Sequence, residues 1–198
     1  MKLSSSRRPH GFTLVELLVV ISIIAVLAAA GFGAGGAAIQ KAKKITALAT
    51  CTAIETSVNN FFTEYGYMPK DGLAADMTTP LNTITDTEFL KVLLGLTETT
   101  TPPLNTRAIK FLTVKEGKLK KNGLIYDTTG TSITGLYDPW GGAYYVMLDG
   151  DYDEKITVQP AASTTKVTLN GRKVAVWSNG ADGVKGSRGK VTDDVKTW

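Results

Sequence analysis

A single carboxylate stands inside the longest apolar run of the chain. Residues 12–39 read FTLVELLVVISIIAVLAAAGFGAGGAAI, and Glu16 is the one charged residue among them. An isolated acidic side chain at the centre of a bilayer costs about 2.5–3.5 kcal/mol on insertion scales, so its presence indicates a function and a partner. Glu16 is therefore the first candidate functional residue. The alternative is that it lies near the end of the run and reaches the membrane interface.

Few other residues offer catalytic chemistry. The only histidine, His10, precedes the apolar run, and the only cysteine, Cys51, has no intrachain disulfide partner. The sequence shows no nucleophile–base pair, no phosphate-binding loop and no basic patch with interleaved aromatic residues. The stretch DGDYD (149–153) alternates carboxylates but lacks the glycine and the final glutamate of an EF-hand, so we interpret it as a turn. These features argue against an enzyme and against nucleic-acid binding.

The apolar run predicts a membrane span. A bilayer core of about 30 Å needs roughly 20 apolar residues in a helix, and residues 12–39 exceed that length. Three basic residues, Lys2, Arg7 and Arg8, precede the run. Positive charge stays on the cytoplasmic side, so the rest of the chain is expected to cross the membrane. A secretory signal peptide cut near residue 30 is the alternative, although the run is long for one.

The run is predicted to continue as one helix over residues 12–65. No proline interrupts this range, and Gly66 and Pro69 follow it. In its second half apolar side chains recur at helical spacing, at residues 48, 51, 54, 58, 61, 62 and 65. This pattern indicates an amphipathic helix that packs on another layer.

The remainder predicts a short helix and several strands. TDTEFLKVLLGL (85–96) is a helix candidate, in which Thr85 and Glu88 fit a capping box. Strand-like runs follow at 107–114, 143–148, 155–158 and 174–178, with 149–153 as a hairpin turn. We therefore expect an α+β fold, in which a long N-terminal helix packs through its amphipathic half on a small antiparallel sheet.

The stretch RRPHGFTLVELLVV (7–20) resembles the processing signal of type IV prepilins, which type IV pilins share with the pseudopilins of type II secretion systems. The resemblance rests on the basic leader, Gly11, Phe12, Glu16 as the fifth residue from Phe12, and the apolar helix. It implies a pilin fold. It also implies that a prepilin peptidase cuts between Gly11 and Phe12 and methylates the new amine of Phe12.

The same resemblance implies how the subunit assembles. In a helical homopolymer Glu16 would pair with the Phe12 amine of a neighbouring subunit, which relieves the cost of a lone charge in an apolar medium. The implied organisation is a removed leader (1–11), a transmembrane and assembly helix (12–39) and a periplasmic domain (40–198), with a single pass through the inner membrane. The implied partners are other copies of the chain, the peptidase, an inner-membrane secretion or pilus assembly platform, and minor pseudopilins.

Three further stretches resemble the major pseudopilins of type II secretion: NFFTEYGYMP (60–69), YDPWGGAYYV (137–146), and VWSNGADG (176–183) followed by DDV (193–195). The last implies a calcium ion in a C-terminal loop. Its ligands would be the carboxylates of Asp182, Asp193 and Asp194, with backbone oxygens near Asn179. The intervening GVKGSRGKVT (183–192) is longer and more basic than the family's loop.

The predicted function is a non-enzymatic subunit of a type II secretion pseudopilus. A type IV pilus subunit for adhesion or motility is the main alternative. Such pilins often carry a disulfide-closed C-terminal loop, which a lone Cys51 cannot form. A minor pseudopilin is a second alternative, and a membrane-anchored periplasmic enzyme or sensor is a third.

Overall fold

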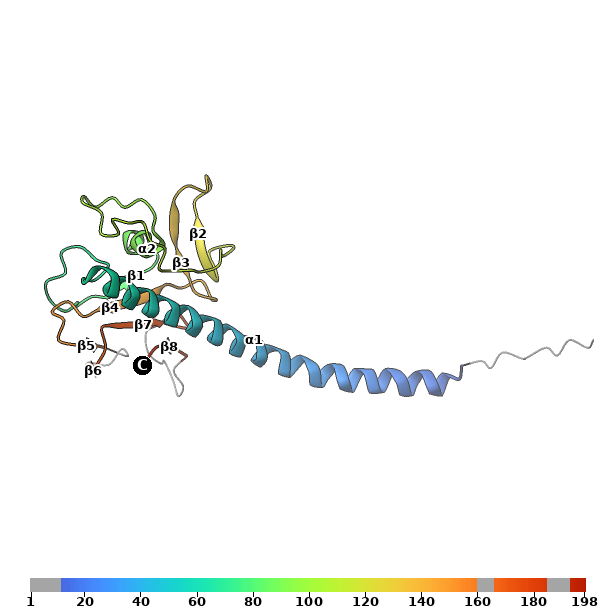
Figure 1. Cartoon of the computed structure of the whole chain (residues 1–198). Helices are drawn as coiled ribbons and strands as arrows, with labels where there is room; N and C mark the ends of the chain where they lie inside the picture. The colour runs from blue at the N-terminus through green and yellow to red at the C-terminus, as the bar shows by residue number, and fades with distance from the viewer. Residues whose placement is uncertain (1–11, 160–165, 185–192) are drawn as a thin grey trace, which may run out of the picture. The chain divides into compact units, whose positions relative to one another are not determined.

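The computed structural model describes residues 12–159, 166–184 and 193–198, with residues 30–34 described by their backbone alone. The chain forms two compact units, Met1–Ala42 and Lys43–Trp198. Helix α1 (Leu14–Tyr65) supplies all the regular structure described in the first unit and continues into the second. The second unit also holds helix α2 (Thr87–Leu94) and all the strands (Figure 1). Each unit is considered by itself below.

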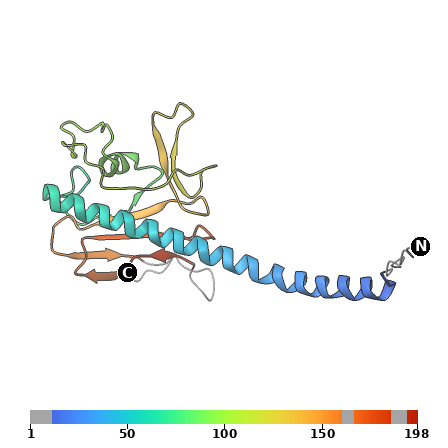
Figure 2. The ribbon, with the colours of Figure 1, turned by 45° about the vertical axis from the view of Figure 1, so that its right-hand side comes forward.

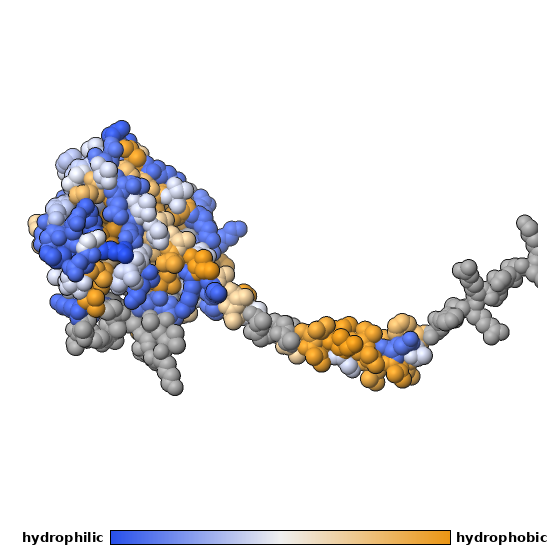
Figure 3. Space-filling model, turned by 60° about the horizontal axis from the view of Figure 1, so that its bottom comes forward, coloured by the Kyte–Doolittle hydropathy of each residue, from blue (hydrophilic) through white to orange (hydrophobic). Residues whose placement is uncertain are grey.

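The helix of the first unit exposes apolar side chains on every side. Its large apolar side chains from Leu14 to Leu27 are between 45% and 86% exposed. Figure 3 shows the resulting apolar surface. Among the described residues, no helix is both long and apolar enough to cross a membrane. The predicted membrane span, residues 12–39, includes residues 30–34, for which the structure describes the backbone but not the side chains.

The second unit buries one face of α1, as the periodicity predicted. Ala47, Cys51, Ile54, Val58 and Phe61 are all fully buried, at alternating spacings of four and three residues. Leu48, predicted on this face, is instead 44% exposed. Successive residues of a helix lie about 100° apart around its axis. Because Ala47 lies on the contact face, Leu48 points away from the centre of that face.

The helix ends where the sequence predicted. Tyr65 is its last residue, and Gly66 follows in the left-handed conformation (φ 77°). The Gly66 amide donates to the Phe62 carbonyl at 2.8 Å, which satisfies one of the last carbonyls of the helix.

A four-stranded antiparallel sheet packs on this part of α1. Its strands are β1 (Leu81–Asn82), β4 (Tyr144–Leu148), β7 (Val174–Ser178) and β8 (Val195–Lys196), in that spatial order. Figure 2 shows strands of this sheet beside the C-terminal half of α1. The central strands β4 and β7 pair from Tyr144↔Ser178 to Leu148↔Val174. Since side chains alternate along a strand, Tyr144, Val146 and Leu148 join the core that contains the helix residues.

The other face of the sheet has its own smaller core. Met147, Ala175 and Trp177 pack there against residues of β5 (Lys155–Val158), which pairs with β6 (Val167–Asn170). Trp198 meets Trp177 edge-on, with ring centroids 5.8 Å apart. Burial on both faces explains why the first four residues of β7, VAVW, are all apolar and do not alternate with polar residues.

The strands predicted at 143–148, 155–158 and 174–178 are confirmed, whereas two other expectations are wrong. Residues 107–114 form no strand; the amides of Phe111 and Leu112 donate to the Leu93 carbonyl at the end of α2. Residues 149–153 do not form a hairpin turn, because β4 pairs with β7 and not with β5.

The capping box predicted for α2 is also wrong. Asp86, not Thr85, is the N-cap residue, and it makes no side-chain cap bond. Its carboxylate accepts from the Asn82 amide at 2.7 Å. The Glu88 carboxylate accepts from Lys91 Nζ at 2.6 Å and from the Thr99 amide at 2.9 Å. Both side chains therefore fasten loops around α2.

One hairpin was not predicted. Strands β2 (Gly123–Tyr126) and β3 (Ile133–Tyr137) pair in an antiparallel register with an irregularity after Ile125. The intervening DTTGTS is turn-forming, and Asp127 Oδ1 accepts from the amides of Thr131 and Ser132 at 3.0 and 3.3 Å.

Candidate functional site

Glu16 lies in the first turn of α1 and caps that helix itself. Its Oε2 accepts from the Thr13 amide at 2.9 Å and from the Thr13 hydroxyl at 2.8 Å. The Glu16 amide in turn donates to Thr13 Oγ1 at 3.2 Å. Reciprocal bonds between residues three apart are a capping box, which satisfies two amides at the helix start. The carboxylate therefore has an intramolecular role that the sequence analysis missed, although the Thr-x-x-Glu signature was present.

The predicted cleavage point lies directly before this turn. Phe12 is 75% exposed, whereas Gly11 and the rest of the leader lie outside the described residues. Cleavage after Gly11 would leave Thr13, the capping partner, as the second residue of the chain. The new amine would then lie within a few residues of the Glu16 carboxylate.

The residues predicted to hold calcium come from two segments that the structure brings together. Asp193 Oδ2 accepts from the amides of Ala181 and Asp182 at 2.6 and 3.0 Å. Asp182 Oδ1 accepts from the Val184 amide at 2.8 Å. Among the described residues, Asp182, Asp193 and Asp194 do not form a group whose carboxylate oxygens all lie within 4.8 Å of one another.

Two features of this loop bear on whether it fits a cation. The Asn179 side-chain oxygen Oδ1 is buried and accepts no hydrogen bond within the described part of the chain. Gly180 has φ 68°, and a Cβ there would stand 2.4 Å from the Asp193 carbonyl oxygen and 2.8 Å from Asp193 Oδ2. The backbone thus approaches the Asp193 oxygens closely, and an oxygen of Asn179 is left without a donor. Both features fit an oxygen-binding cation such as calcium.

A different acidic group has converging carboxylates. Oxygens of Asp76, Asp149 and Asp151 lie within 4.8 Å of one another. Asp149 is fully buried and accepts from the amides of Tyr152 and Glu154 at 2.8 and 2.9 Å. Burial raises the pKa of the Asp149 carboxyl, although these two hydrogen bonds oppose the shift. Because the carboxylate fastens the loop after β4, we interpret this group as structural.

Cys51 is a core residue. It is fully buried, and burial raises the pKa of its thiol, with smaller contributions from the nearby carboxylates Asp138 and Glu55. A protonated, inaccessible thiol is chemically inert. Cys51 therefore supports packing, not catalysis.

Comparison with known protein families gives a match for the N-terminal segment. Residues 6–32 match the family described as the prokaryotic N-terminal methylation motif. No curated protein and no solved structure matches the chain. The motif is typical of type IV pilin-like proteins and pseudopilins, which are structural subunits and not enzymes. It implies processing by a prepilin peptidase and a membrane-anchored precursor that assembles into a filament.

Proposed function

We propose that this chain, which carries the methylation motif of pilin-like subunits, is a subunit of the periplasmic pseudopilus of a type II secretion system. The observation that carries the proposal is the motif itself, with Glu16 at the start of an exposed apolar helix. The polymer would grow from an inner-membrane platform, be completed by minor pseudopilins and push folded proteins outward. The lone, buried Cys51 favours this function over that of a pilin with a disulfide-closed loop.

The proposal includes a single pass of residues 12–39 through the inner membrane, with residues 40–198 in the periplasm. The exposed apolar side chains of the first unit support this placement, because a surface of this kind needs a lipid or protein partner. Deletion of the gene in the native organism is the test. Loss of protein secretion would support the pseudopilus, whereas loss of surface fibres with normal secretion would support a type IV pilus.

Processing is predicted to depend on Gly11. The mature chain from native membranes should begin at Phe12 and be one methyl group heavier than its bare sequence. Gly11→Val should leave the precursor uncut, because a branched side chain would occupy the peptidase site next to the scissile bond. Intact mass spectrometry measures both the N-terminal residue and the added methyl group.

Gly36→Val is the matched control, since a Cβ at Gly36 meets no atom within 4 Å. The precursor with this substitution should be cut normally. A chain that starts at Met1 in wild type would refute the motif's role.

We further propose that the C-terminal loop binds calcium through Asp182, Asp193 and Asp194, with an oxygen of Asn179 completing the shell. The buried, donorless Oδ1 of Asn179 and the close approach of Gly180 to Asp193 support this proposal. Calcium would tie residues 179–184 to residues 193–194 and so hold the edge strand β8 on β7.

Calcium is predicted to raise the thermal midpoint of the full chain in detergent. A ligand at 100 times its Kd stabilises the native state by about 2.7 kcal/mol, and a chelator should reverse the shift. Asp193→Asn should abolish the calcium-dependent shift. Asp127→Asn, at the exposed β2–β3 turn, is the control and should retain it. An identical midpoint with calcium and with chelator in the wild type would overturn the proposal.

A further inference from the structure

One leucine of the second unit stands almost wholly in solvent. Leu119 is 94% exposed, the highest value for any large apolar side chain in the described residues. It lies at the tip of a turn in which the Lys118 and Lys121 amides each donate to the other residue's carbonyl at 3.1 Å. We call residues 118–121 the lysine–leucine turn. The packing of the residues that the structure describes does not account for an apolar side chain there.

The backbone of the lysine–leucine turn makes Leu119 more unusual. Leu119 and Lys120 have φ values of 53° and 55°, the left-handed conformation at both central positions. Turns of this kind favour Asn-Gly or Gly-Gly, because side chains with a Cβ are strained there. A leucine in a strained and solvated position points to a function for its side chain.

The turn is also strongly basic. Lys118, Lys120 and Lys121 flank Leu119, and all three are exposed. The surface they form combines one apolar side chain with three ammonium groups. Its complement is an apolar cavity with an acidic rim.

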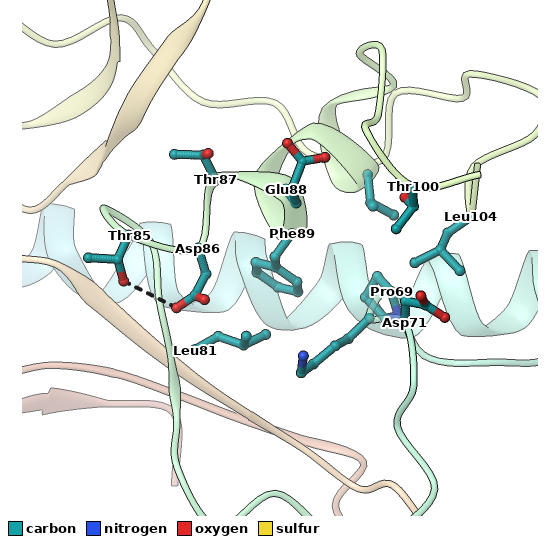
Figure 4. A pocket seen from close by; sticks show the side chains of 12 residues that line it. Pro69, Asp71, Leu81, Thr85, Asp86, Thr87, Glu88, Phe89, Thr100 and Leu104 are labelled. Atoms are coloured by element: carbon teal, nitrogen blue, oxygen red, sulfur yellow. Dashed lines mark hydrogen bonds between the residues drawn. The ribbon is translucent and has the colours of Figure 1, made fainter. Parts of the chain in front are cut away.

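The same unit carries a cavity of that kind beside α2. The cavity has a volume of about 300 Å³. Its apolar wall includes Leu81, Phe89 and Leu104, which Figure 4 shows around a common space. Leu81 and Phe89 are 6% and 4% exposed, so they form a floor, not a free surface.

Carboxylates surround the entrance. Asp71, Asp86 and Glu88 line the cavity, against one lysine, Lys70. Figure 4 shows these three carboxylates around the apolar floor. Glu88 is already paired with Lys91 at 2.6 Å, but the three carboxylates still outnumber Lys70 and Lys91. The rim is therefore net acidic, and it complements the lysines that flank Leu119.

We propose that the lysine–leucine turn of one copy docks in this cavity of a second copy, with Leu119 over Phe89 and the flanking lysines against the acidic rim. The proposal rests on the proposed function, because a filament supplies the second copy. Turn and cavity are different patches of one unit, so the contact is heterologous and can propagate along a polymer. The charged rim would fix the register of the contact.

Disulfide trapping tests the contact in assembled filaments of the full chain. Lys120→Cys combined with Thr85→Cys, at the cavity edge, should give a ladder of covalent multimers on oxidation. Either single variant should give none, and the buried Cys51 is too inaccessible to interfere. Thr129→Cys combined with Thr85→Cys moves the first thiol to the β2–β3 turn and should give no ladder. A single Lys120→Cys variant that cross-links to another protein would assign a different occupant and overturn the proposal.

Leu119→Gly measures the contribution of the side chain. Glycine adopts the left-handed conformation freely, so this variant should fold at least as well as wild type. Filament yield should fall at least about tenfold, as for truncation of an interface anchor. Leu96→Gly is the control, because Leu96 is 41% exposed and does not line the cavity.

The results separate this inference from the proposed function. Normal filaments with Leu119→Gly and no ladder would overturn the docking and leave the filament subunit intact. A processed wild-type chain that forms no filament in its native membranes would refute the proposed function, and the docking with it.

Discussion

Replacing Glu16 by valine is expected to abolish filament assembly while the chain still inserts in the membrane. Valine removes the carboxylate that would pair with the Phe12 amine of a neighbouring subunit. Breaking a buried ion pair leaves the remaining charge uncompensated and costs about 3–5 kcal/mol. That cost corresponds to at least roughly a 100-fold loss in each subunit contact. Insertion should be unaffected or easier, because the lone charge is gone.

Because Glu16 is part of a capping box, a second variant is needed to separate the loss of the charge from the loss of the helix cap. Since Glu16 also binds the Thr13 amide and hydroxyl, valine removes a helix cap as well as a charge. Glu16→Gln keeps an oxygen that can accept from Thr13 but carries no charge. If charge pairing drives assembly, glutamine should fail as valine does. If glutamine assembles normally, the residue acts as a cap and the pairing hypothesis is wrong.

The measurement needs two readings from the same cells. Carbonate-resistant membrane association reports insertion, and sedimentation of sheared filaments reports assembly. Thr13→Val supplies the converse variant, because it removes the hydroxyl of the capping box and leaves the Glu16 charge. We expect it to assemble with a modest loss, since a missing N-cap costs about 0.5–2 kcal/mol.

The parts of the fold that the sequence could predict are those with a strong local pattern. The buried face of α1 follows from the spacing of Cys51, Ile54 and Val58, and the central strands follow from the apolar runs at 143–148 and 174–178. The strand predicted at 107–114 is absent because apolar composition does not determine which group accepts hydrogen bonds from the backbone amides. Here the end of α2 takes them, through the Leu93 carbonyl.

Glu16 stands out in the sequence because a charge in an apolar run is costly. The capping role of Thr13 was not predicted, because the helix was expected to begin at residue 12, whereas it begins at Leu14. The convergence of Asp76 with Asp149 could not be predicted, because the chain folds back between them and no local pattern records it. Leu119 likewise has no local signal in the sequence, because its turn conformation and its exposure depend on the fold.

The largest loss of stability that we predict for the second unit follows from substitution of Asp138. Its carboxylate is 1% exposed and has four donors. Oδ1 accepts from the amides of Trp140, Gly141 and Gly142 at 2.8–2.9 Å, and Oδ2 accepts from the Ser178 hydroxyl at 2.6 Å. One side chain thus holds the turn before β4 and ties it to the end of β7.

Asp138→Ala is expected to lower the free energy of unfolding by about 3–5 kcal/mol. Three half-buried turn amides and the buried Ser178 hydroxyl lose their acceptor at once, and each buried group left unsatisfied costs about 1–3 kcal/mol. This is a large share of the 5–15 kcal/mol typical of a domain. Urea unfolding of the full chain in detergent, followed by tryptophan fluorescence, measures it. Asp138→Asn should lose less, because its amide oxygen can still accept from the turn amides.

Asp127→Ala is the matched control for this experiment. Asp127 is half-buried and also accepts from two turn amides, but these hydrogen bonds are exposed, so water replaces the lost acceptor and the loss should stay below about 1 kcal/mol. Equal losses for Asp138→Ala and Asp127→Ala would show that strand pairing, and not the buried carboxylate, holds the turn. The Ser178 hydroxyl also accepts from the Gly180 amide at 3.1 Å. If the C-terminal loop binds calcium as proposed, the loss of Asp138 should also weaken its calcium-dependent stabilisation.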